Sequence, residues 1–139
     1  MLFRSESRIR AAAPLAPGVL RDSLVLAQQI ASPTLLIAGD LDRLVQIDQE
    51  RRLSAALSAG GGPHWFVTLH GAGHLSFADV CLPIFGGCGP DDLAPSDAQA
   101  QIRGWTTAFF LRYVAGDDRY AAWFLDAPPA FVDIARPSS

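Results

Sequence analysis

The sequence predicts an α/β fold in which parallel strands alternate with helices, and three observations support this. Residues 34–38 (TLLIA) and 65–69 (WFVTL) are largely apolar runs, the pattern of strands that are buried on both faces of a parallel sheet. Between them, residues 49–59 place Leu53 and Leu57 at helical spacing. A strand, a helix and a strand in this order form a βαβ unit, whose two strands run parallel.

The residues around the middle helix indicate where it begins and ends. Asp48 is a candidate N-cap, because its carboxylate can accept the first free backbone N–H groups of the helix. Gly60 follows the last periodic residue, which is typical of a helix end. The glycines at 60–62 lead into a strand, so they lack the helix N-terminus that a phosphate-binding loop needs.

Two weaker elements precede this unit. Residues 9–15 (IRAAAPL) are a third strand candidate, although Pro14 limits pairing near its end because proline has no N–H to donate. Residues 22–30 are expected to form a short helix before the first strong strand. The sequence therefore predicts about three parallel strands with flanking helices.

A substantial helix is expected near the end of the chain. Ser96 and Gln99 have the spacing of a capping box, and the apolar face that follows runs to Gly116. Residues 126–139 contain three prolines and few large apolar side chains, so we expect a poorly ordered tail there. Residues 1–125 are expected to belong to a single domain.

Composition excludes several classes of partner. The 139 residues carry 11 basic and 14 acidic side chains, and the basic residues, all arginine, do not cluster. No electrostatic footprint for nucleic acid or an anionic membrane is therefore expected. No apolar run approaches the ~18 residues of a transmembrane helix, and the first residues lack the apolar stretch of a signal peptide. As written, the chain is expected to be soluble, and no compartment follows from it.

Functional groups in parallel sheets gather beyond the carboxyl ends of the strands. The first strong strand is followed by Asp40 and Asp42, and the second by His70 and His74 on a glycine-containing loop. If the strands are neighbours, an acidic turn lies beside a histidine. A carboxylate that fixes the tautomer of an imidazole supports it as a general base, and this gives Asp42 and His74 a role together.

These segments resemble α/β-hydrolases. Residues 33–42 (PTLLIAGDLD) are similar to the acid-bearing segment of that superfamily, in which the acid stands three residues after the strand-ending glycine, here Asp42. Residues 69–79 (LHGAGHLSFAD) resemble the histidine loop of the dienelactone-hydrolase and platelet-activating-factor-acetylhydrolase branch, with His74 as the base. Residues 110–120 are similar to the end of the last helix of these proteins and of cutinase-like polyester hydrolases.

The resemblance covers roughly residues 8–125 and implies the C-terminal part of an α/β-hydrolase fold. It implies an ester hydrolase that acts through an acyl-enzyme, without a metal or organic cofactor, on a small-molecule, lipid or polyester ester. Because such relatives are often secreted, it also implies possible export of a full-length protein. No Gly-x-Ser-x-Gly nucleophile turn occurs in the sequence. The chain alone is therefore expected to be inactive.

Several alternatives stay open. The chain could be an inactive truncated product, or a non-catalytic assembly subunit that completes its sheet with another chain, and the apolar edge at residues 9–15 would favour self-association. A flavodoxin-like nucleotide-binding domain is disfavoured, because no glycine-rich turn joins a strand to a helix. His64 and His70 are expected to be structural.

The cysteines leave two further alternatives. Cys81 and Cys88 could form one disulfide in an oxidising compartment, or could equally be two reduced loop residues. A zinc site from both cysteines with His70 and His74 is disfavoured, because intervening stretches of three, six and six residues match no usual zinc-finger pattern.

Overall fold

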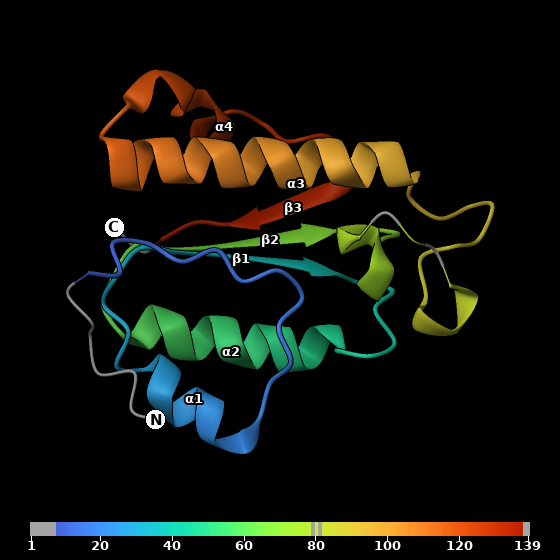
Figure 1. The fold of residues 1–139 in the computed structure, drawn as a ribbon, viewed down its shortest axis with the longest axis horizontal. Helices are drawn as coiled ribbons and strands as arrows, with labels where there is room; N and C mark the ends of the chain where they lie inside the picture. The colour runs from blue at the N-terminus through green and yellow to red at the C-terminus, as the bar shows by residue number, and fades with distance from the viewer. Residues whose placement is uncertain (1–7, 79, 81, 138–139) are drawn as a thin grey trace.

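The computed structural model of the protein describes residues 8–78, 80 and 82–137, which form a small α/β fold in three layers (Figure 1). A three-stranded sheet lies in the middle, with α1 and α2 on one face and α3, with α4 beside it, on the other. The strands are β1 (Thr34–Gly39), β2 (His64–Leu69) and β3 (Val132–Ala135). The α-helices are α1 (Arg21–Ala27), α2 (Ile47–Ala59), α3 (Pro95–Phe110) and α4 (Ala122–Leu125).

The predicted βαβ unit is confirmed. β1 and β2 pair in parallel over six residues, from Thr34 opposite His64 to Gly39 opposite Leu69, and α2 connects them. Every residue of both strands is buried. The continuous apolar runs therefore correspond to strands that are covered by helices on both faces.

The third parallel strand was predicted wrongly. Residues 9–15 do lie parallel to β1, but they form only two isolated bridges, Ala12 to Thr34 and Leu15 to Ile37. Between the bridges, Pro14 accepts a hydrogen bond from the N–H of Ile37 through its carbonyl but has no N–H to return. This segment follows the edge of β1 without becoming a strand.

The tail also differs from the prediction, because residues 132–135 form β3. This strand is antiparallel to β2, with Val132 opposite Leu69 and Ala135 opposite Phe66, so the sheet is mixed. Val132 is buried in the core. Composition pointed to disorder because it counts the prolines without regard to their positions. The prolines at 128 and 129 precede β3 and do not interrupt it.

Alternate residues of the strands face two separate cores. Leu35 and Ile37 of β1 pack with α3 and α4, whereas Leu36 and Ala38 pack with α1 and α2. The larger core contains Trp105 and Phe109 of α3 and Phe124 of α4, all at most 2% exposed. Trp65 joins it from β2 and donates its indole N–H to the hydroxyl of Tyr113 at 3.0 Å.

The helices begin at different residues from those predicted, whereas Gly60 ends α2 as expected. α2 begins at Ile47 with Gln46 as its N-cap, while Asp48 pairs with Arg51 on the surface. α3 begins at Pro95, where the fixed φ of proline suits a first helical turn. The helical path continues through a wider turn, Leu111–Ala115, and ends at Gly116 in the left-handed conformation (φ 69°), as the glycine predicts.

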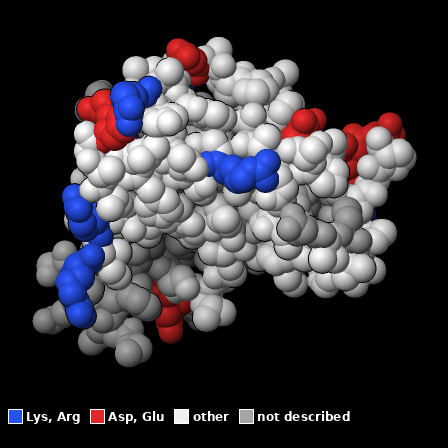
Figure 2. Space-filling view, turned by 45° about the horizontal axis from the view of Figure 1, so that its top comes forward, with Lys and Arg blue, Asp and Glu red and all other residues white. Residues whose placement is uncertain are grey.

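The surface carries no dominant charge on the face drawn in Figure 2. Most of that face is uncharged, and arginines and acidic side chains occupy small separate groups. Among the described residues, no helix is both long enough and apolar enough to cross a bilayer.

We expect removal of residues 127–139 to lower the free energy of unfolding by ~2 kcal/mol or more. The loss follows from withdrawing buried Val132 and the backbone hydrogen bonds of β3 from β2. Urea unfolding followed by circular dichroism measures it. The point variant Val132→Thr should show a smaller loss of the same sign, and unchanged stability in the shortened chain would mean that the tail is not part of the fold.

Candidate active site at the carboxyl ends of the strands

The parallel pairing of β1 and β2 brings the two predicted site residues together. Asp42 lies in the loop that follows β1, residues 40–45, which we call the acid loop. His74 ends the loop that follows β2, residues 70–74, which we call the histidine loop. The Nδ1 atom of His74 lies 2.8 Å from Oδ2 of Asp42. The backbone N–H of Leu41 donates to the carbonyl of Ala72 at 3.0 Å and joins the two loops directly.

Asp42 is held almost completely out of solvent. Its side chain is 1% exposed, and its second oxygen, Oδ1, accepts the backbone N–H groups of Leu44 at 2.7 Å and Val45 at 2.8 Å. Three donors therefore surround one carboxylate, and they stabilise its negative charge and fix its orientation.

His74 is more accessible to solvent than Asp42, because its side chain is 25% exposed. A carboxylate can only accept, so Nδ1 carries the proton in this pair. In the part of the chain that the structure describes, no hydrogen-bond partner lies at Nε2. The ring therefore has one nitrogen fixed by Asp42 and one nitrogen left for proton transfer.

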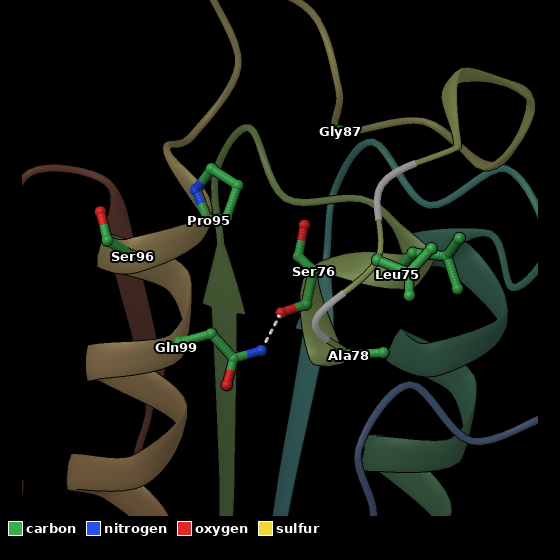
Figure 3. A pocket seen from close by; sticks show the side chains of 8 residues that line it. Leu75, Ser76, Ala78, Gly87, Pro95, Ser96 and Gln99 are labelled. Atoms are coloured by element: carbon green, nitrogen blue, oxygen red, sulfur yellow. Dashed lines mark hydrogen bonds between the residues drawn. The ribbon is translucent and has the colours of Figure 1, made fainter.

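The backbone before His74 is held by the turn that follows it. His74 begins a short 3₁₀ helix, η1 (His74–Phe77), and the hydroxyl of buried Ser76 accepts the N–H of Gly73 at 3.0 Å. The carbonyl of Ser76 in turn accepts the side-chain amide of Gln99 from α3 at 2.8 Å, as Figure 3 shows. The histidine loop is therefore anchored to the helix layer.

A crevice separates η1 from the first turn of α3 (Figure 3). Its volume is about 250 Å³. Leu75 and Ala78 line it from the histidine side, and Pro95 and Ser96 line it from α3. This places a mainly apolar hollow, with a few polar groups, next to the residue that follows His74.

Sequence reasoning missed a second Asp–His contact at the same edge. His70 bridges two carboxylates, with Nδ1 2.8 Å from Asp40 and Nε2 2.8 Å from Asp133 of β3. Hydrogen bonds to Asp40 and then to Asp133 raise the pKa of His70. Asp40 and His70 each follow directly after paired strand ends, so the strand register was the signal that could have revealed their contact.

Glu50 was also missed. It is 1% exposed, and neither carboxyl oxygen has a hydrogen-bond partner among the described residues. Burial, with a further contribution from the negative charge of Asp42, raises the pKa of Glu50 to about 8. Glu50 stands three residues before Leu53 and seven before Leu57, so helical periodicity could have placed it on the buried face of α2.

The third histidine lies at the opposite end of β2. His64 Nε2 is 2.9 Å from the hydroxyl of Ser54 in α2, and both residues are buried. Burial lowers the pKa of His64 to about 4. A serine and a histidine in contact suggest a nucleophile and its base, but this pair is closed to solvent, so we assign it to packing between α2 and β2.

The remaining predictions about this region concern metals and cysteines. Among the described residues, no group of three or more His, Cys, Asp or Glu side chains could hold a metal ion. His70 and His74 contact different aspartates instead of converging. The choice between a Cys81–Cys88 disulfide and two reduced cysteines, which the sequence leaves open, involves Cys81, which lies outside the described residues.

We expect Glu50→Gln to stabilise the protein increasingly as the pH rises. The folded state holds a proton on Glu50 up to about pH 8, whereas the unfolded state releases it near the ordinary value of 4.5. Stability therefore falls as the pH rises through this window, and glutamine removes the effect. The advantage of the variant should grow by about 4 kcal/mol between about pH 4 and pH 8 in urea unfolding. Asp48→Asn, at an exposed position of α2, should show no such trend.

We expect Asp133→Asn to lower the pKa of His70 and to weaken the fold mainly in acid. Because the folded-state pKa of His70 is raised, its contribution is complete below the ordinary value of 6.5 and is lost as the pH rises through the folded value. The destabilisation should therefore be larger near pH 5.5 than near pH 9. NMR titration of the His70 ring measures the pKa, and an unchanged value would contradict the bridging geometry.

Comparison with known proteins assigns no family to the chain. No protein-family model matches it, and no curated protein matches it either. The resemblance to α/β-hydrolases therefore stays an expectation that rests on the sequence segments around Asp42 and His74.

Proposed function

We propose that this chain is the C-terminal portion of a serine-dependent carboxylic-ester hydrolase of the α/β-hydrolase superfamily, and that it supplies the acid and the base of a Ser-His-Asp triad. The observation that carries the proposal is the 2.8 Å contact between Asp42 and Nδ1 of His74 across the ends of two parallel strands. The three-stranded mixed sheet is compatible with part of such a fold.

The proposed chemistry follows from the difference between the two ring nitrogens of His74, of which Nδ1 is hydrogen-bonded to Asp42 and Nε2 is not. In the proposed reaction, Nε2 of His74 accepts the proton of a serine hydroxyl as its oxygen attacks the ester carbonyl, and then donates that proton to the leaving alcohol. Water then attacks the acyl-enzyme while Nε2 accepts its proton, and Nε2 returns that proton to the serine oxygen as the bond to the acid breaks. Asp42 stays a carboxylate throughout, holds the ring by Nδ1 and stabilises the imidazolium between the steps.

The nucleophile has to come from residues outside this sequence, because no Gly-x-Ser-x-Gly turn occurs in it. Two sources are compatible with this requirement, a longer reading frame that contains this chain and a separate partner chain. Translating the coding DNA upstream of Met1 in the same frame distinguishes them. A strand, a Gly-x-Ser-x-Gly turn and a helix in that frame would support the first source, and an in-frame stop codon would favour the second.

The second source corresponds to an assembly subunit, and one observation favours it. Ile9 is 44% exposed and Leu15 is 37% exposed on the segment that borders β1, so apolar side chains lie along this edge of the sheet. Light scattering during gel filtration tests it. A monodisperse monomer at micromolar concentration would count against an assembly role.

In a protein that contains both this chain and the nucleophile, we expect His74→Ala to lower kcat for p-nitrophenyl butyrate by roughly 10³-fold or more, and Asp42→Asn by a similar order. His70→Asn is the matched control, because both nitrogens of His70 are occupied by carboxylates. The control should retain activity within severalfold. Retained turnover in His74→Ala would refute the assignment, as would labelling of a serine in this chain alone by a fluorophosphonate.

A further inference from the structure

A pair of consecutive buried glycines lies where the acid loop and the histidine loop meet. Gly86 and Gly87 follow a short 3₁₀ helix, η2 (Pro83–Phe85), in the long connection from η1 to α3. We call residues 83–87 the strap. Both glycines have positive φ, 78° and 74°, a conformation that side-chain-bearing residues rarely adopt.

The strap contacts the acid loop on one side. The backbone N–H of Arg43, next to Asp42, donates to the carbonyl of Phe85 at 3.3 Å. Gly86 approaches the carbonyl of Leu41 so closely that a Cβ on Gly86 would lie 1.9 Å from that oxygen. The residues on both sides of Asp42 are therefore held by the strap, and only glycine fits at this contact.

The strap contacts the histidine loop on its other side. A Cβ on Gly87 would lie 2.1 Å from the backbone nitrogen of Gly73, and a Cβ on Gly73 would lie 2.0 Å from the carbonyl oxygen of Gly86. Gly73 directly precedes His74, whose ring centroid is 6.5 Å from that of Phe85. Gly87 lines the same crevice as Leu75 and Ser76 (Figure 3).

We propose that the strap is a positioning element that sets the hydrogen bond between Asp42 and His74, with Gly86 locating the acid loop, Gly87 locating the histidine loop and Phe85 limiting the access of water to the imidazole. The catalytic meaning of this inference rests on the function proposed above. The positioning itself concerns only the two loops and their hydrogen bond.

Such an element has a physical reason, because the hydrogen bond between Asp42 and His74 tolerates little change in distance. A charge-assisted hydrogen bond has an optimum near 2.8 Å and weakens within a few tenths of an ångström, whereas loops at strand ends are the more mobile parts of a fold. Asp42 and His74 are 32 residues apart and depend on different strands. A third segment whose glycine backbone packs against both loops restricts the movement of one loop relative to the other.

The experiment uses the low-field proton NMR signal of the His74 Nδ1–H, assigned by its loss in Asp42→Asn. Gly86→Ala and Gly87→Ala each introduce one methyl group at a contact that cannot accept it. We expect both variants to shift this signal upfield or to lose it to faster exchange with water. Phe85→Leu leaves the backbone unchanged and should accelerate the exchange while keeping the signal near its native position.

Gly61→Ala and Gly116→Ala are matched controls. These glycines also have positive φ, 80° and 69°, but a Cβ on either would meet nothing within 4 Å. They impose the same kind of backbone strain without touching either loop, so the signal should stay in place even if their melting temperatures fall. Circular dichroism on every variant separates loss of the contact from loss of the fold.

The outcomes separate this inference from the proposed function. A signal that is unchanged in Gly86→Ala, Gly87→Ala and Phe85→Leu would overturn the inference. The strap would then pack against the two loops without affecting their hydrogen bond. Absence of any Asp42-dependent signal from the native chain would overturn it too. A signal that responds to strap variants but not to the controls would support it, even if the protein with a nucleophile hydrolysed no ester. If the glycine variants unfold, the exchange rate of the Nδ1 proton in Phe85→Leu tests the inference. Faster exchange than in the native chain would support it, and an unchanged rate would overturn it.

Discussion

The parallel pairing of β1 with β2 is the constraint on which the rest of the molecule depends. Six consecutive residue pairs fix the register, so the chain leaves both strands at the same edge and at the same level. The two loops that follow then meet without any element between them, and the N–H of Leu41 reaches the carbonyl of Ala72. A shift of one residue would separate these loops and would also exchange the two buried faces of a strand, and both apolar cores oppose this.

The same register brings several carboxyl groups together near the ends of β1 and β2, and their surroundings differ. Asp40 and Asp133 share His70, whose pKa is raised by them. Asp42 is surrounded by two backbone N–H groups and His74. Glu50, which has none of these donors, stays protonated up to about pH 8 because burial beside Asp42 disfavours its charge. The carboxylate of Asp42 therefore has three hydrogen-bond donors, whereas that of Glu50 has none among the described residues.

The sequence predicted those features that depend on local pattern. The strands β1 and β2, the helical face of α2 and the end of the helical path from α3 at Gly116 follow from the spacing of apolar residues and glycines, and the Asp42–His74 contact follows from parallel strand ends. It did not predict β3, since pairing Val132 with Leu69 is a long-range event that proline-rich composition conceals. Nor did it predict the strap, because Gly86 and Gly87 resemble any flexible loop until the two loops that they contact are placed.

Two histidines in contact with aspartates lie at one edge of the sheet, and the difference between them is the strongest structural argument about function. His70 uses both ring nitrogens on carboxylates, so no nitrogen remains to exchange a proton with a substrate. His74 uses only Nδ1, its acid is sealed at 1% exposure, and its ring stays 25% exposed. A histidine that merely ties two loops together needs no such asymmetry, whereas a general base needs a fixed tautomer on one side and access on the other. The arrangement of His74, more than its distance to Asp42, therefore favours acid–base chemistry at this position.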